Sequence, residues 1–149
     1  MRRFSADPTG QQKSAAFIME MMNKRGIQKV QLLNASTANV PPAVFGEVIV
    51  PGAQKTLIFY AHYDGQPVNP AQWAQGLDPF QPKLFSGPID KGGTNIPFPA
   101  DSNYNKDWRI YARGASDDKA GVTAILNAYE AITKTGQAPG CNLKFFFEG

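Results

Sequence analysis

Residues 56–65 read TLIFYAHYDG, an apolar run that stops abruptly at His62. The run is apolar on both alternating faces, which is typical of a strand in the middle of a covered sheet. His62 is the only histidine of the chain and follows the strand, where open α/β sheets place ligands and reactive groups. Asp64 lies two residues later, on the same side of an extended backbone, so its carboxylate can orient the imidazole. On the pair alone, a loop histidine beside an ordinary turn aspartate is the favoured interpretation.

Two helices are predicted from apolar residues at helical spacing. The first covers about residues 10–25, with Thr9 as N-cap, Gln12 completing a capping box and Gly26 as the left-handed stop. The second covers about residues 119–135 and is followed by glycine and proline. The stripes expected to face the core are Ser14, Phe17, Ile18, Met21 and Met22 in the first helix and Val122, Ile125, Leu126, Tyr129 and Ile132 in the second.

Short β-type runs predict strands at residues 29–33, 44–50, 55–61, 108–111 and 143–149. The compact turn sequence at residues 51–53 predicts that the second and third of these form an antiparallel hairpin. Residues 65–107 show no sustained period and are expected to form one long loop, which in a compact domain is often functional. The order of helix, strands, loop, strand, helix and strand predicts a layered α/β domain.

Composition narrows the class of protein. The chain has 149 residues, 42% of them hydrophobic, which is enough to bury the core of one domain. Its net charge of +3 comes from scattered basic residues, so a nucleic-acid binder is not expected. There is no apolar run long enough to cross a membrane and no apolar segment after Arg3 that would make a signal peptide; the cellular compartment stays open. A single cysteine, Cys141, excludes an internal disulfide and a multi-cysteine zinc site.

A second polar cluster, RGASDDK at residues 113–119, separates a strand from the second helix. Asp117 or Asp118 could simply cap that helix. Two adjacent carboxylates followed by Lys119 exceed what a cap requires, and a carboxylate at this position can also coordinate a cation.

Three segments in this order resemble one family: LIFYAHYDGQP at residues 57–67, RIYARGASDDKAG at 109–121 and LKFFFEG at 143–149. The pattern is similar to the co-catalytic zinc amidohydrolases of the M-twenty metallopeptidase family, which includes carnosinase, aminoacylase, acetylornithine deacetylase and succinyl-diaminopimelate desuccinylase. The resemblance implies a three-layer α/β catalytic domain around a central mixed sheet, of which residues 1–149 are the N-terminal part, without the lid and dimerisation domain.

The same resemblance implies the roles of individual residues. His62 would ligate one zinc ion and Asp117 would bridge two. Asp64 would help to orient the site without binding a metal ion itself. Cobalt or manganese could replace zinc. It also implies a cis peptide between Asp117 and Asp118. In the family, Glu148-Gly149 is normally followed by one residue and two glutamates, a general base and a metal ligand, so the chain is expected to be an inactive portion of the enzyme. The implied substrates are dipeptides or N-acyl amino acids, and the complete enzyme could be a homodimer.

One departure from the family pattern is the separation of 55 residues between His62 and Asp117, which is longer than usual. The excess is expected within residues 86–107, near the mouth of the active site. Two other interpretations stay open: a related zinc aminopeptidase without a lid, and a binding module that has lost its metal site.

Overall fold

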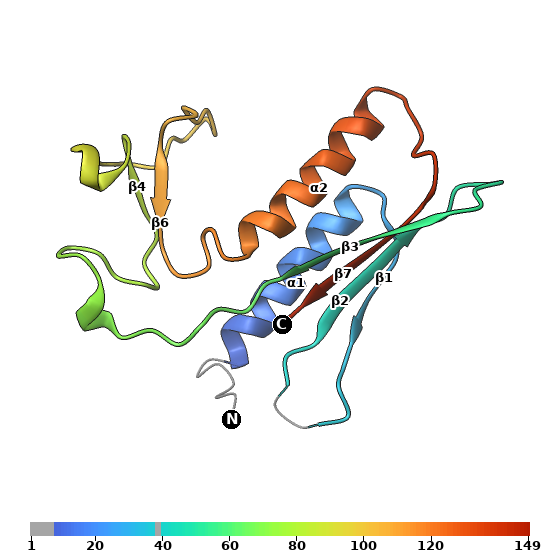
Figure 1. Cartoon of the computed structure of the whole chain (residues 1–149), viewed down its shortest axis with the longest axis horizontal. Helices are drawn as coiled ribbons and strands as arrows, with labels where there is room; N and C mark the ends of the chain where they lie inside the picture. The colour runs from blue at the N-terminus through green and yellow to red at the C-terminus, as the bar shows by residue number, and fades with distance from the viewer. Residues whose placement is uncertain (1–7, 38–39) are drawn as a thin grey trace.

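The computed structural model describes residues 8–37 and 40–149 and contains one larger mixed sheet (Figure 1). Its strands are β1 (Gln28–Leu33), β2 (Ala43–Val48), β3 (Thr56–His62) and β7 (Asn142–Glu148), in the spatial order β1-β2-β7-β3. β1 and β7 both run antiparallel to β2, whereas β3 runs parallel to β7. A mixed sheet in an α/β chain confirms the predicted fold class.

The predicted hairpin between β2 and β3 is wrong in its pairing. β7 lies between these two strands, with Phe147 opposite Val44 of β2 and also opposite Ala61 of β3. The turn itself is present, since Gly52 has φ +80° and the Ala53 amide donates to the Val50 carbonyl at 3.1 Å. β2 and β3 therefore run in opposite directions, as a hairpin requires, but the β7 run of aromatic residues occupies the place between them.

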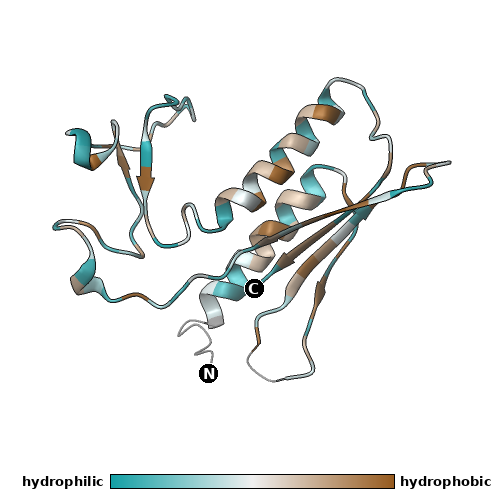
Figure 2. Cartoon of the chain, in the orientation of Figure 1, coloured by the Kyte–Doolittle hydropathy of each residue, from teal (hydrophilic) through white to brown (hydrophobic). Residues whose placement is uncertain are grey.

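Both helices, α1 (Pro8–Lys24) and α2 (Lys119–Lys134), pack against the same face of this sheet. Among the described residues, two of the three expected layers are therefore present. One continuous core joins helices and strands; its largest fully buried side chains outside the small sheet are Met22, Val44, Tyr63, Leu126, Phe145 and Phe147. Hydrophobic residues recur along α2 and through the strands of the larger sheet (Figure 2). In the described part of the chain, neither helix has the length and apolar character of a membrane span.

Three details of the predicted helices are wrong. Thr9 lies inside α1 instead of capping it, because the helix already begins at Pro8. Phe17 and Ile132 were expected on the core stripes, yet they are 61% and 45% exposed. Each lies at the edge of its stripe, where the width of the neighbouring layer and not the helical period determines burial.

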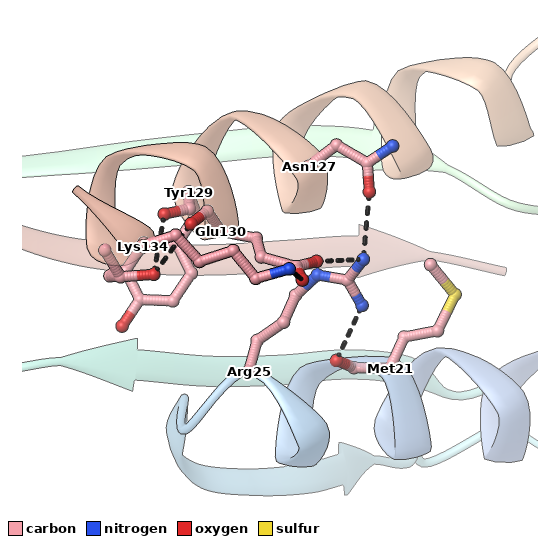
Figure 3. Close-up of polar contacts among 7 residues, drawn as sticks. Met21, Arg25, Asn127, Tyr129, Glu130 and Lys134 are labelled. Atoms are coloured by element: carbon pink, nitrogen blue, oxygen red, sulfur yellow. Dashed lines mark hydrogen bonds and ion pairs between the residues drawn. The ribbon is translucent and has the colours of Figure 1, made fainter.

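A polar cluster links the two helices at one end (Figure 3). Arg25 follows α1 and donates from Nη1 to the Met21 carbonyl at 3.1 Å and from Nη2 to Asn127 Oδ1 at 2.9 Å. Its Nη2 also lies 2.7 Å from Glu130 Oε2. A hydrogen bond from Lys134 and the charge of Arg25 lower the pKa of Glu130. The cluster fixes how the end of α1 lies against α2.

β3 lies at an edge of the larger sheet and not in its middle, which corrects the expectation from its apolar sequence. Leu57, Ile58 and Tyr60 are 47%, 63% and 58% exposed. The central strand is β7, whose Leu143, Phe145 and Phe147 are buried beneath the helices. An apolar pattern on both faces therefore did not distinguish a central strand from this exposed edge strand.

A second, smaller sheet takes two of its strands from the region predicted as one long loop and its third from the strand predicted at residues 108–111. It consists of β4 (Lys83–Phe85), β5 (Asn95–Ile96) and β6 (Arg109–Tyr111), in the antiparallel order β5-β4-β6. Two short 3-10 helices, η1 (Pro70–Gln72) and η2 (Ile89–Lys91), lie in the connecting segments. In Figure 1, β4 and β6 stand apart from the larger sheet. Strands of two or three residues are too short to show a period in the sequence.

Candidate metal-binding site

His62 and Asp64 lie together at the end of β3, as their spacing predicted. His62 Nδ1 is 2.8 Å from Asp64 Oδ1. The side chains are 31% and 40% exposed, so the pair lies near the surface at the carboxyl end of β3. A carboxylate at this distance accepts a hydrogen bond from Nδ1–H. The lone pair of Nε2 is then free to coordinate a metal ion.

The tertiary structure brings Asp117 to the other ring nitrogen. Asp117 Oδ1 lies 3.2 Å from His62 Nε2, although the two residues are 55 positions apart in the sequence. Its side chain is 73% exposed, so one oxygen faces the imidazole while most of the carboxylate is open to solvent. The peptide bond between Asp117 and Asp118 is cis, as the resemblance implied.

The chemistry of this contact fits a bound cation. With Nδ1–H donating to Asp64, the Nε2 lone pair faces an oxygen of Asp117. Two acceptors at hydrogen-bond distance repel each other unless a proton or a cation lies between them. Imidazole nitrogen and carboxylate oxygen are both zinc ligands, with bonds of about 2.0–2.2 Å, and two such ligands around one tetrahedral ion lie about 3.3 Å apart. The 3.2 Å separation of His62 and Asp117 matches that spacing.

The donor set among the described residues is incomplete. Within residues 8–37 and 40–149, there is no group of three or more His, Cys, Asp or Glu side chains placed to hold a metal ion. Glu148 pairs with His62 in the register of β7 and β3, but its Oε2 accepts a hydrogen bond from the Tyr60 hydroxyl at 2.6 Å. Catalytic zinc sites usually have three protein ligands, so His62 and Asp117 would supply only part of one.

Asp118 has a role that its sequence position did not reveal. It occupies the N-cap position of α2, but its side chain makes no capping hydrogen bond. Instead, its Oδ2 accepts a hydrogen bond of 3.3 Å from the backbone amide of His62. Gly121 makes room for this carboxylate, since a Cβ at that position would lie 2.3 Å from Asp118 Oδ1. The pattern of two aspartates followed by a glycine three positions after the second is the only signal in the sequence.

Tyr63 anchors the backbone between His62 and Asp64. Its ring is buried, its hydroxyl donates to the Pro42 carbonyl, and its amide donates to the Glu148 carbonyl at 2.7 Å. Burial raises the pKa of Tyr63 to about 12, and the charge of Asp64 contributes to the rise. Tyr63 was not among the predicted functional residues, because an aromatic residue after a strand has no specific signature.

Fold and site together define a class: α/β proteins with a candidate metal site at the carboxyl end of a strand, here β3, in a mixed sheet. Residues 58–149 match the model of peptidase family M20/M25/M40, and the chain belongs to this family. The matched region contains all three predicted site residues, His62, Asp64 and Asp117. Family membership was predicted from the three sequence segments and is confirmed.

The relatives that the chain matches include two kinds of dipeptidase. The chain is 32% identical over 145 residues to the Cys-Gly metallodipeptidase DUG1 of Candida albicans, covering 91% of this chain and 26% of that protein. It is 28% identical over 120 residues to the human Beta-Ala-His dipeptidase, covering 80% of this chain and 19% of that protein. The chain therefore spans about a quarter or less of the length of these relatives.

Solved structures show the same fold. The crystal structure of human carnosine dipeptidase 1 superposes with a TM-score of 0.64 at 22% identity, over 97% of this chain and 28% of that one. The structure of the dipeptidase Dug1p from Saccharomyces cerevisiae gives a TM-score of 0.63 at 24% identity, over 92% and 26% of the two chains.

Proposed function

We propose that this chain forms part of a metal-dependent peptidase that hydrolyses peptide or amide bonds in dipeptides or N-acyl amino acids at a site for two zinc ions. The observation that carries the proposal is the approach of His62 Nε2 to Asp117 Oδ1 at 3.2 Å, with Asp64 on the other ring nitrogen. The family match supports hydrolysis, and the dipeptidase relatives support dipeptides as the substrate class.

Each residue has a distinct part in this proposal. His62 would hold one ion through Nε2, and Asp117 would bridge both ions because its two carboxylate oxygens can each bind one. Asp64 accepts a hydrogen bond from His62 Nδ1–H and thereby fixes the orientation of the ring. Bound zinc would polarise the scissile carbonyl and lower the pKa of a water molecule. Cobalt or manganese could occupy the same oxygen and nitrogen ligands.

The proposal assigns residues 1–149 to the N-terminal part of the catalytic domain, with no lid or dimerisation domain among them. Since the chain covers about a quarter of its relatives, substrate selection and any homodimer contact would depend on segments outside these residues. We further propose that residues 86–107 lie near the mouth of the active site.

We expect the 149-residue chain to bind zinc weakly and to show no metal-dependent turnover, because only two ligands converge in the described residues. Zinc titration by calorimetry, together with NMR of the single histidine ring, tests the first point. Zinc should shift the His62 signals in the wild type, and Asp117→Ala should abolish the shift. Unchanged His62 signals at millimolar zinc would contradict the proposed site.

Hydrolysis is tested with a panel of dipeptides and N-acyl amino acids in the presence of zinc. The protein encoded by a longer natural reading frame that contains these residues should hydrolyse members of the panel. His62→Ala or Asp117→Ala should abolish its turnover. Turnover by the 149-residue chain that is lost on chelation, or tight binding of two zinc ions, would show that its ligand set is more complete than proposed.

A further inference from the structure

Lys119 is the first residue of α2, and its side chain turns back toward the end of β3. Its Nζ donates a hydrogen bond of 2.7 Å to the Tyr63 carbonyl, 56 positions earlier in the chain. A cation is unfavourable in the first turn of a helix, where the macrodipole is positive. The stability of α2 therefore does not explain this side chain.

Burial also works against the charge of Lys119. It lowers the pKa of the ammonium group, while the nearby Asp64 carboxylate opposes that change. A half-buried ammonium is tolerated only where acceptors replace the lost water. The Tyr63 carbonyl is one such acceptor, and the charge of Asp64 is a second source of stabilisation.

Gly114 leaves the space that the ammonium group occupies. It is buried, has φ +77°, and a Cβ there would lie 2.9 Å from Lys119 Nζ. The segment that turns from β6 toward α2 is therefore shaped around the lysine as well as around the aspartates.

Tyr63 is the residue between His62 and Asp64, so its carbonyl belongs to the backbone that spaces these two side chains. β7 holds its amide and the Pro42 carbonyl holds its hydroxyl. Lys119 supplies a third attachment, from the same helix terminus that carries Asp117 and Asp118. One ammonium group thus connects the two segments of the site.

We propose that Lys119 is a positioning residue that holds the His62–Asp64 pair in place opposite Asp117 by donating from Nζ to the Tyr63 carbonyl. The importance of this geometry for metal binding rests on the proposed function, but the positioning itself is a property of the metal-free chain.

Amide hydrogen exchange of the metal-free chain tests the inference. Removing a charged hydrogen-bond donor by Lys119→Met should accelerate exchange at the His62 and Tyr63 amides about tenfold or more. The Phe145 amide in β7 reports on overall stability and should be unaffected. Lys134→Met, which removes another lysine of the same helix, should leave His62 and Tyr63 unchanged.

Chemical rescue separates the ammonium group from simple packing. Lys119→Cys in a Cys141→Ser background can be alkylated in urea with 2-bromoethylamine and refolded, which restores an ammonium at nearly the original length. Exchange at His62 and Tyr63 should return to the wild-type rate with this group but not with an uncharged propyl group.

Unchanged exchange in Lys119→Met, equal rescue by the propyl group, or equal acceleration at Phe145 would each overturn the positioning role. Since exchange is measured without metal, a failure of zinc to shift the His62 signals would overturn the proposed function alone.

Discussion

At the scale of single residues, the site depends on positions where a side chain is missing. Gly121 lies in the first turn of α2 directly under the Asp118 carboxylate, and Gly114 lies against Lys119 Nζ. Both absences allow a charged group from the start of α2 to reach the backbone at the end of β3, at His62 and Tyr63. The orientation of the candidate ligands is therefore set partly by glycines that never touch a metal or substrate.

Gly121→Ala should destabilise the chain by about 1 kcal/mol, although alanine is the better helix former by about 0.8–1 kcal/mol. The new Cβ would displace the Asp118 carboxylate and break its bond to the His62 amide. Urea unfolding followed by circular dichroism measures the change. In an Asp118→Ala background, the same substitution should instead be stabilising. A gain of equal size in both backgrounds would show that the contact is unimportant.

Tyr63 predicts a stability change at high pH. Its pKa is about 12 in the folded chain, against 10.0 for an ordinary tyrosine. Between these values the folded chain binds more protons than the unfolded chain, so stability should be complete below pH 10 and fall by about 2–3 kcal/mol toward pH 12. Tyr63→Phe should lose about 1 kcal/mol at neutral pH, because the Pro42 carbonyl is left unpaired, and should show a shallower decline above pH 10.

Urea midpoints of both proteins at pH 9, 10, 11 and 12 make the comparison. Tyr129, whose pKa is also raised by burial, is present in both proteins and cancels in the difference. Parallel declines in wild type and Tyr63→Phe would contradict the assignment to Tyr63.

At the scale of elements, the close approach of α1 to β2 depends on a glycine in the strand. A Cβ at Gly46 would lie 2.5 Å from Met22 Cε and 2.8 Å from Ile27 Cγ2. Cores resist added volume because they are already packed to crystal-like density. The helix layer can lie this near to the sheet only because β2 has no side chain at this position.

Gly46→Ala should therefore cost about 1–3 kcal/mol through overpacking. In a Met22→Ala background, the terminal methyl that it meets is gone, and the cost should be smaller. A double-mutant cycle from urea unfolding measures this coupling. Additive effects would mean that α1 adjusts its position without resistance.

At the scale of the whole molecule, the sheet has one covered and one open side among the described residues. β3 forms an edge of the sheet, and its exposed side chains are large and apolar. Exposed edge strands with such side chains are templates for pairing with another chain. This arrangement favours association of the chain through β3.

Ile58→Lys should reduce concentration-dependent self-association, because Ile58 is 63% exposed on the edge strand and a lysine there blocks edge pairing. Sedimentation velocity over a range of protein concentrations measures the effect. Ile132→Lys is a matched control, since Ile132 is 45% exposed on α2, away from the edge. An equal reduction by both substitutions would indicate general hydrophobic association and not pairing through β3.

Local sequence patterns were sufficient for both helices, for the four strands of the larger sheet and for the polar groups at their ends. A helix or an isolated strand is encoded by spacing within a few residues, and the three segments around His62, Asp117 and Glu148 identified the family. The i, i+2 spacing of His62 and Asp64 likewise predicted their contact, because no distant residue is needed to bring them together.

The strand order, the edge position of β3 and the small sheet required the tertiary structure. β7 lies between β2 and β3 although it begins about 80 residues after β3 ends. The residue pattern of a strand does not indicate which other strand it will pair with. The same holds at the site, where the sequence marked the run from Asp117 to Lys119 as unusual but did not show what Asp118 and Lys119 bind. Their carboxylate and ammonium groups acquire partners at His62 and Tyr63 only when packing of α2 against the sheet brings the two segments together. Those contacts depend on distance in space and leave no periodic trace in the sequence.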